Sequence, residues 1–421
     1  MTTSKEDGEA AKASQIWQDV DLQTLLSDSA RTIGAGSATA AGAGWKLDHP
    51  NPIIAAGGIP DAPNLPSEDL LESLKGILTG NPSETLRYGG VMGYEGLRTL
   101  IAQRQSRLDH MDLSAENILV HNGGSGCLDN IGQAFINSGD VAIIEDPNYS
   151  GTTRAIKGHM AEIVGVPVDN DGLSVEGVAN AIEEAQGKGK RVKIVYVTPD
   201  YQNPTATVLS ADRRAELIKL CAKHQILIVE DCTYSELYFD EPVPPSIYSM
   251  AGGEGVLKLG TFSKVIATGL RAGWVQGRAD YIESMGRVRF DMGTSPLIIH
   301  MLNEYIGSGK LEPHIEKMKL IYGKKAETLT TSLLENCGPN VKVNKPGGGF
   351  FLWFEVVGTT TEEVLKASVE EGLLFTAGSE FYLDKSTDTT HGRMAFSNAS
   401  LDQLEEIGRR LGRALQKATS K

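Results

Sequence analysis

The chain has few cysteines, no long apolar run and no excess of positive charge, and each absence excludes a class of protein. Its four cysteines are scattered without a C-x-x-C pair, which indicates free thiols in a reducing cytoplasm rather than disulfides or a metal site. No run of about 18 apolar residues is present, so we expect no membrane-spanning helix. The N-terminus lacks the apolar core of a secretory signal. A formal charge of −14 argues against nucleic-acid binding.

The residues that are present are typical of a large globular α/β protein. Hydrophobic residues make up 40% and charged residues 22% of 421 positions, and a chain of this length can bury a large core. From residue 85 onward, short apolar runs alternate with helical patterns, which predicts a mostly parallel sheet buried between helices. We expect seven strands, at residues 118–120, 141–144, 162–166, 192–197, 226–229, 256–259 and 274–275.

The pattern after this sheet predicts a second, smaller α/β domain. A long helix over residues 281–306 leads out of the sheet. Further helices near 312–335, 361–371 and 401–417 alternate with strands near 350–356 and 393–396. We therefore divide the chain into a flexible N-terminal arm (1–45), an N-terminal part of the small domain (46–84), a large domain (85–290) and the rest of the small domain (291–421).

Lys264 stands in a Gly/Ser/Thr turn directly after the apolar run 256–259. Desolvation of a lysine lowers its pKa, which makes the amine nucleophilic toward an aldehyde. The hydroxyls of Thr261 and Ser263 and the guanidinium of Arg271 suit a dianionic phosphate. Together these residues predict a site for pyridoxal 5′-phosphate, whose chemistry begins from a lysine imine. For the lysine alone, an ordinary surface turn is the simpler interpretation.

Further polar residues follow the expected strands, at the edge where parallel sheets bind ligands. Gly124 and Ser125 lie at a strand-to-helix junction, where free backbone N–H groups bind phosphate. Tyr149 suits stacking on a flat heterocycle. Taken alone, the glycine-rich segment fits a plain turn equally well, and Tyr149 fits ordinary packing.

Two loops carry groups that suit the ring of the same cofactor. The amide of Asn203 is able to donate to a phenolate-like oxygen, and Tyr234 is able to bond the ring hydroxyl. Asp231 ends a buried strand, where a carboxylate is costly unless it is paired, and a protonated pyridine nitrogen is a suitable partner. A helix N-cap explains Asp231 nearly as well. Arg393 suits a substrate α-carboxylate, although its spacing alone favours a surface salt bridge.

With these residues assembled, the chain resembles the class I/II aminotransferases, which are pyridoxal-phosphate enzymes of fold type I, over roughly residues 50 to 415. The motifs occur in the family's order: a tyrosine-containing motif at 88–98, the glycine-rich turn, D-P-x-Y, Q-N-P-T, D-x-x-Y, S-K and R-x-x-F-S. The stretch at 56–60 is similar to the branch that contains 2-aminoadipate and kynurenine aminotransferases.

The resemblance implies a role for each residue. Lys264 corresponds to the Schiff-base lysine and proton shuttle, Asp231 to the partner of the pyridine nitrogen, and Arg393 to the carboxylate-binding arginine. Gly58 corresponds to a backbone contact close to substrate. Tyr88 corresponds to a tyrosine that reaches the phosphate from the neighbouring subunit, which implies a homodimer with shared sites. The remaining cofactor contacts are Asn203, Tyr234, Tyr149, Gly124, Ser125, Thr261, Ser263 and Arg271.

The chain also departs from the family's usual motifs, at loops around the cofactor and substrate. The usual glycine after Asn-Pro-Thr is Ala206, and the proline usual before Gly-Leu-Arg is Thr268. We expect transfer of an amino group from an α-amino acid to a 2-oxo acid. The departures leave open β- or γ-elimination or replacement, in one case with S-adenosylmethionine. A regulatory binding module like that of the MocR-type regulators is a third reading.

Overall fold

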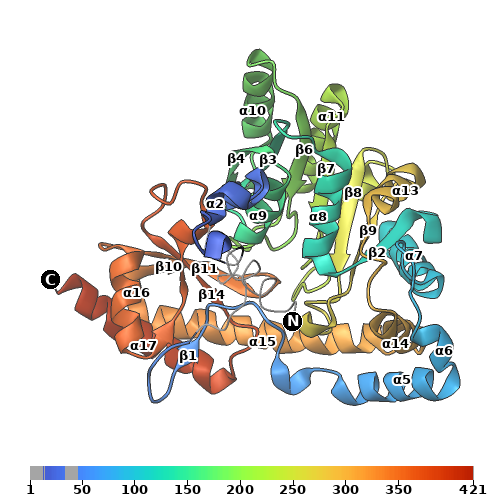
Figure 1. The fold of residues 1–421 in the computed structure, drawn as a ribbon. Helices are drawn as coiled ribbons and strands as arrows, with labels where there is room; N and C mark the ends of the chain where they lie inside the picture. The colour runs from blue at the N-terminus through green and yellow to red at the C-terminus, as the bar shows by residue number, and fades with distance from the viewer. Residues whose placement is uncertain (1–12, 14, 34–45, 421) are drawn as a thin grey trace, which may run out of the picture.

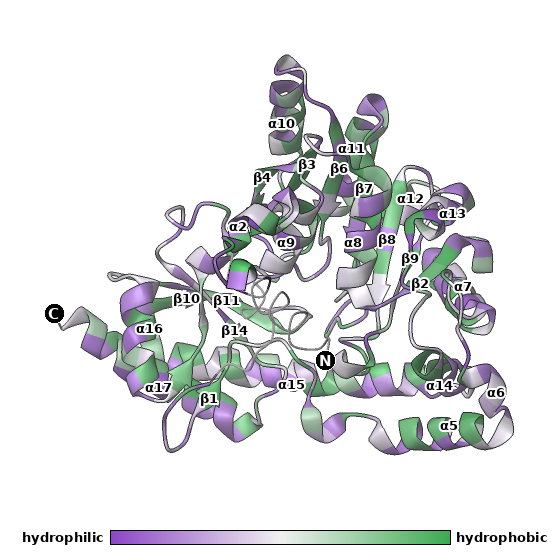
Figure 2. Ribbon diagram, viewed as in Figure 1, coloured by the Kyte–Doolittle hydropathy of each residue, from purple (hydrophilic) through white to green (hydrophobic). Residues whose placement is uncertain are grey.

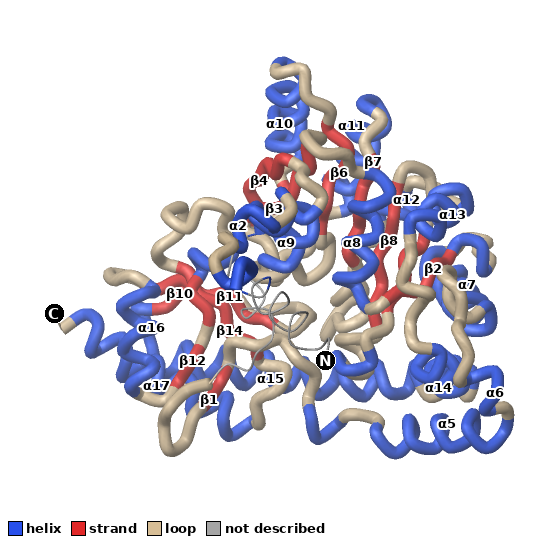
Figure 3. Tube along the Cα trace, viewed as in Figure 1, coloured by secondary structure: helices blue, strands red, loops and turns tan. Residues whose placement is uncertain are grey.

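The computed structural model describes residues 13, 15–33 and 46–420, and the strands of these residues form three sheets (Figures 1 and 3). The larger sheet has the order β2-β9-β8-β7-β6-β3-β4-β5. Its strands are β2 (Ile118–His121), β3 (Val141–Asp146), β4 (Glu162–Asp169), β5 (Gly172–Leu173), β6 (Val192–Val197), β7 (Leu227–Asp231), β8 (Val256–Thr261) and β9 (Gly273–Gln276). Five neighbouring strands, β8, β7, β6, β3 and β4, are parallel to one another, whereas β2, β9 and β5 pair antiparallel.

The expected number of seven strands is too low by one. The eighth strand, β5, has only two residues and follows β4 through a tight turn in which Gly172 has a φ of +91°. So short a strand has no apolar run of its own, and the sequence pattern therefore does not reveal it.

Alternate residues of the central strands pack against helices on opposite faces of the sheet. Val141 and Ile143 of β3 belong to a core cluster with α10 (Val175–Gly187) and α11 (Ala211–His224). Their neighbours in β3 pack instead with α8 (Gly123–Phe135) and α13 (Ala279–Val288). This two-sided burial explains why the strands are apolar along their length, as Figure 2 shows.

The smaller sheet is antiparallel, with the order β10-β11-β14-β13. Its strands are β10 (Val341–Val343), β11 (Phe351–Val356), β13 (Thr376–Ala377) and β14 (His391–Ala395). A two-stranded parallel pair joins β1 (Ile53–Ile54) to β12 (Leu373–Leu374), so residues near 53 lie beside the C-terminal part of the chain. The long helix α15 (Leu311–Cys337) packs along α17 (Leu401–Thr419) beneath this sheet (Figure 1).

The remaining α-helices are α2 (Leu22–Leu25), α3 (Asp28–Ile33), α5 (Ser67–Gly80), α6 (Pro82–Thr85), α7 (Glu95–Asp109), α9 (Ser150–Gly158), α12 (Ile247–Met250), α14 (Pro296–Gly307) and α16 (Thr361–Glu370). The described residues also form five short 3-10 helices, which are η1 (Ala62–Asn64), η2 (Ala115–Asn117), η3 (Thr268–Leu270), η4 (Gly338–Asn340) and η5 (Gly378–Phe381). Within the proposed arm, α3 contacts α9, because the Ser29 hydroxyl donates to Gly158 O at 2.7 Å. Residues 1–12, 14 and 34–45 of the arm lie outside the described residues. The domain boundaries stay a prediction.

The expectation of one helix over residues 281–306 is wrong. The structure breaks it into α13 and α14, with residues 289–295 between them. Gly293 has a φ of +96°, and Pro296 occupies the first turn of α14, where its missing N–H leaves no helical bond unmade. The residue before a proline also avoids helical backbone geometry.

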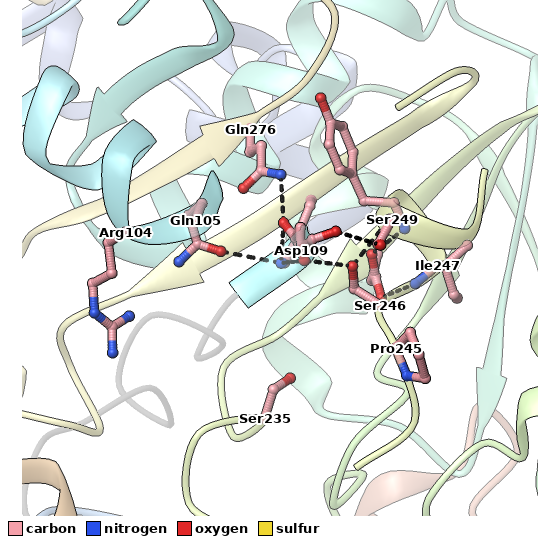
Figure 4. Close-up of polar contacts among 12 residues, drawn as sticks. Arg104, Gln105, Asp109, Ser235, Pro245, Ser246, Ile247, Ser249 and Gln276 are labelled. Carbon is pink, nitrogen blue, oxygen red and sulfur yellow. Dashed lines mark hydrogen bonds and ion pairs between the residues drawn. The ribbon is translucent and has the colours of Figure 1, made fainter. Parts of the chain in front are cut away.

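A buried polar network holds the end of α7 against the strands that lead to the site (Figure 4). The Asp109 carboxylate accepts hydrogen bonds from Lys258 Nζ at 2.7 and 2.8 Å, from Gln276 Nε2 at 2.8 Å and from the Ser246 hydroxyl at 2.7 Å. Lys258 lies in β8, six residues before Lys264. Because a buried charge is stable only when it is paired, this network fixes the position of β8 within the fold.

In the part of the chain that the structure describes, no helix is long and apolar enough to cross a membrane. Nor do three or more histidine, cysteine or carboxylate side chains gather there in a metal-binding group.

Candidate functional site

Lys264 lies three residues beyond the end of β8, and its amine meets a loop from the N-terminal part of the chain. Lys264 Nζ donates to Gly58 O at 2.7 Å. Burial, followed by the nearby Arg393 and Arg271, lowers the pKa of Lys264 to about 8, although the Asp231 carboxylate acts in the opposite direction. A larger fraction of this amine is therefore neutral at physiological pH than for an ordinary lysine.

The loop that carries Gly58 is fastened from two sides. The Asp61 carboxylate accepts a bond from Lys325 Nζ at 2.5 Å, and the Ser397 hydroxyl donates to Ile59 O at 2.7 Å. A side chain at position 58 would overlap the ring of Phe351, so only glycine lets the loop approach this closely. The loop therefore holds its carbonyl at a fixed place beside the Lys264 amine.

Asp231, at the end of β7, is held by hydrogen bonds on both carboxylate oxygens. The Tyr196 hydroxyl donates to Oδ2 at 2.6 Å. Thr233 donates to Oδ1 through its backbone N–H at 3.0 Å and its hydroxyl at 2.5 Å. Among the described residues no α-helix begins here, so Asp231 stabilises a turn and the helix N-cap interpretation is wrong.

The glycine-rich segment and the arginine expected at the phosphate lie together. Arg271 donates to Asn122 O at 3.1 Å, directly before the first residue of α8. The helix N-terminus has no side-chain cap from Asn122, which leaves backbone N–H groups of the first turn to an anion. A Cβ on Gly124 would meet no atom within 4 Å, so this turn faces open space.

Thr261 and Ser263 supply buried hydroxyls beside this segment. The Thr261 hydroxyl donates to the Ser263 hydroxyl at 3.0 Å and accepts the Ser263 backbone N–H at 3.1 Å. Gly123 was not singled out in the sequence, yet its φ is +75° and a Cβ there would lie 2.8 Å from the guanidinium of Arg271. The two consecutive glycines, Gly123 and Gly124, were the feature of the sequence that could have indicated this position.

Arg393 is 6% exposed and forms no ion pair with any residue that the structure describes, so the interpretation as a surface salt bridge is wrong. It donates to Asn203 Oδ1 at 2.7 Å and to Ala56 O at 2.5 Å, while its buried Nε has no hydrogen-bond partner in the described part of the chain. Its guanidinium lies 4.1 Å from the ring centre of Phe351 and 4.6 Å from that of Phe381. Burial lowers the pKa of Arg393 to about 10. The pair of rings fixes the plane in which a carboxylate can approach.

The three tyrosines expected at the site differ in their surroundings. Tyr234 is buried, and its ring packs edge-on against Phe351 with a centroid distance of 5.8 Å. Tyr149 precedes α9 and is 46% exposed, which leaves a ring face available. Tyr88 is 84% exposed on this single chain.

The family model for aminotransferase class I and II matches residues 56–411. The chain belongs to this family. It is 31% identical to aromatic-amino-acid aminotransferase 1 of Thermococcus litoralis, over 88% of this chain and 89% of that protein. It is 28% identical to 2-aminoadipate transaminase of Thermus thermophilus, over 87% of this chain and 91% of the relative. The resemblance drawn from the motifs is therefore confirmed.

A solved structure agrees with this assignment. The multiple substrate aminotransferase of Thermococcus profundus superposes with a TM-score of 0.87 at 28% identity, over 95% of this chain and 100% of that one. The expected fold type, with a mostly parallel large sheet and a smaller domain, is confirmed. The chain is an aminotransferase with pyridoxal 5′-phosphate as its cofactor, and it acts on amino acids and 2-oxo acids.

The residues of this aminotransferase fit that cofactor on structural grounds. The lowered pKa of Lys264 gives an amine able to attack an aldehyde, and the open turn at Gly124 beside Arg271 suits a phosphate. The Asp231 carboxylate has no ion-pair partner among the described residues and lies at the carboxyl edge of the sheet, where a charged ring nitrogen would be expected.

Gln202 is a second residue to which the sequence analysis assigned no role. Its Nε2 donates to Pro147 O at 2.8 Å, and its Oε1 accepts from the Thr205 backbone and hydroxyl at 3.0 and 2.7 Å. It thereby ties the loop of Tyr149 to the loop of Asn203. Its position next to Asn203 in Q-N-P-T was the available signal.

Ala206, where the family usually has glycine, retains the left-handed backbone that glycine favours. Its φ is +60°. An alanine in this region costs about 1 kcal/mol relative to glycine. The departure from the motif therefore changes the side chain and the local strain, but not the path of the loop.

Proposed function

We propose that this aminotransferase takes the amino group from an α-amino acid of the aromatic or 2-aminoadipate type and passes it to a 2-oxo acid, with Lys264 as the proton carrier. The substrate classes come from the names of the relatives. The observation that carries the proposal is the proximity of Lys264, whose pKa is lowered to about 8, to the buried Arg393, whose Nε has no partner among the described residues. The amine of Lys264 transfers the proton of the substrate Cα, and Arg393 binds the carboxylate attached to that carbon.

When bound, pyridoxal 5′-phosphate supplies an aldehyde carbon that takes up the amino group and a ring that withdraws electrons from Cα. Arg393 binds the substrate carboxylate between its two aromatic neighbours, which orients the Cα–H bond. Asn203 uses its Oδ1 to accept from Arg393, so its amide N–H groups are left to donate to the ring hydroxyl, together with Tyr234.

With the cofactor bound, the amine of Lys264 would take the proton from the substrate Cα and would carry it for return during the transfer of the amino group. A base with a pKa near the working pH is suited to this task because it can both accept and release the proton. Gly58 O, which accepts from Lys264 Nζ, keeps the free amine beside the reacting atoms between these two steps. Asp231 holds a proton on the ring nitrogen through its negative charge, and Tyr149 offers a stacking face.

The test is a single half-reaction with a panel of amino acids and no acceptor. We expect aromatic amino acids or 2-aminoadipate to give one equivalent of 2-oxo acid per site, with a matching change in the cofactor's absorbance. Catalytic release of a leaving group without 2-oxo acid, or reaction with S-adenosylmethionine alone, would instead support elimination or replacement.

We also propose that the aminotransferase is a homodimer in which Tyr88 serves the partner's phosphate site. Tyr88 and Phe290 are 84% and 93% exposed. The two segments that carry them lie side by side, because Arg289 donates to Val91 O at 2.7 Å. The second segment also contacts the glycine-rich segment, since Asn122 Nδ2 donates to Asp291 Oδ2 at 3.1 Å.

Mixing two inactive variants tests the shared site. Tyr88→Ala and Lys264→Ala should each be nearly inactive alone, yet hybrid dimers contain one complete site, so the refolded mixture should recover about a quarter of wild-type activity. Wild-type mixed with each variant serves as the control for exchange. No recovery despite proven exchange would mean that Tyr88 does not act across the dimer.

The lowered pKa of Lys264 predicts how the apoenzyme reacts with its cofactor at different pH. Only the neutral amine attacks the aldehyde, so the rate of covalent attachment should rise about tenfold per pH unit up to pH 8 and then level off. Stopped-flow absorbance with apoenzyme measures this rate. A rise that continues beyond pH 9 would show an ordinary lysine pKa.

A further inference from the structure

Tyr196 is a buried phenol inside an apolar strand, and neither the motifs nor the cofactor assignment gives it a role. It lies in β6, is 3% exposed, and donates its hydroxyl proton to Asp231 Oδ2 at 2.6 Å. Burial and the adjacent charge of Asp231 raise the pKa of Tyr196 well above its usual value. The hydroxyl therefore remains a neutral donor throughout the range in which the enzyme works.

The acceptor sites of Asp231 are nearly filled before any cofactor arrives. A carboxylate offers roughly two acceptor sites on each oxygen. Thr233 takes Oδ1 with two donors, and Tyr196 takes one site of Oδ2. The one acceptor site left is on Oδ2, and the hydrogen bond from Tyr196 sets the direction in which this oxygen points.

Hydrogen bonds, rather than a cation, hold the charge of Asp231. Among the residues that the structure describes, no lysine, arginine or histidine makes an ion pair with this carboxylate, whereas other buried carboxylates, such as those of Asp200 and Asp109, have one. Donated hydrogen bonds favour the ionised form of a carboxylate without neutralising it. The full negative charge is therefore left for a proton on the partner group.

We propose that Tyr196 is a positioning residue for the reaction: its hydrogen bond aims Oδ2 of Asp231 at the ring nitrogen, so that this nitrogen stays protonated as the pH rises. The proposal rests on the proposed function, because it assumes that Asp231 faces the cofactor ring. Removing the hydroxyl weakens the pairing without removing the carboxylate.

The test replaces the one hydroxyl by Tyr196→Phe and loads the protein with cofactor labelled with nitrogen-15 in the ring. In the wild type we expect the nitrogen signal to remain that of a protonated ring to higher pH than in the variant, with a shift of about one pH unit or more. The rate of Cα proton removal in a single half-reaction should fall by about tenfold to a hundredfold, while substrate KM changes little. Tyr305→Phe is the matched control, since Tyr305 is fully buried and its hydroxyl makes one bond of 3.4 Å to Lys310 O.

The possible outcomes separate this proposal from the function on which it rests. An unchanged nitrogen titration in Tyr196→Phe, together with an altered one in Asp231→Asn, overturns the role of Tyr196 and leaves the function intact. If Asp231→Asn leaves the titration unchanged as well, the assignment of Asp231 fails. If Tyr196→Phe does not fold, Thr233→Val removes the hydroxyl bond to the other carboxylate oxygen, Oδ1 of Asp231. This variant should shift the titration of the ring nitrogen in the same direction. An unchanged titration in Thr233→Val would overturn the proposal.

Discussion

An alanine at position 264 will leave the protein folded but remove its transaminase activity. We expect turnover to fall by at least about ten-thousandfold, because the variant loses both the nucleophile that holds the aldehyde and the base that moves the Cα proton. Its visible absorbance in the presence of cofactor should be that of free cofactor. Steady-state assays and absorbance spectra measure the two effects separately.

A second substitution at this position separates charge from proton transfer. Lys264→Arg keeps a cation in the same place, but a guanidinium does not deprotonate in proteins, so this variant should be as inactive as the alanine variant. Lys319→Arg is the matched control, since Lys319 is also largely buried and lies 3.3 Å from the ring centre of Tyr238. Retention of wild-type activity in Lys264→Ala would contradict the assignment of the site.

Much of the fold and of the site follows from the sequence because parallel strands buried on both faces leave a readable pattern. The central strands are mostly apolar, and a ligand binds where such strands end. Asp231 ends β7, Asn203 follows β6 by six residues, and Lys264 follows β8 by three. The sequence therefore locates the polar groups by their distance from the runs, without any knowledge of the contacts between them.

The contacts that tune these groups were not predictable, because they join positions far apart in the chain. Lys264 meets Gly58 across 206 positions, and Arg393 meets Ala56 across 337. Tyr196 looks like a core residue because it occupies one position of an apolar strand, and only the register between β6 and β7 brings its hydroxyl to Asp231. Such pairs depend on strand order, which an apolar run does not specify.

Replacing Asp231 by asparagine should separate cofactor binding from catalysis. The phosphate-binding segment around Arg271 and the amine of Lys264 are untouched, so the variant should still take up pyridoxal 5′-phosphate. An uncharged amide cannot hold a proton on the ring nitrogen, and removal of the Cα proton should therefore slow by about a hundredfold or more. Single-turnover kinetics with the Cα hydrogen replaced by deuterium will show whether this step has become the slow one.

The size of this effect depends on what remains around the asparagine. Tyr196 and Thr233 donate to the carboxylate in the native chain, and the amide oxygen can still accept from one of them, so the side chain should keep its place while losing its charge. A loss of rate then reports the charge rather than a displaced loop. Asp169→Asn, at the end of β4 and paired with Arg213 on the surface, is the control for removing one carboxylate elsewhere. If Asp231→Asn reacts as fast as wild type with an unchanged isotope effect, the negative charge at the edge of β7 has no part in withdrawing electrons from Cα.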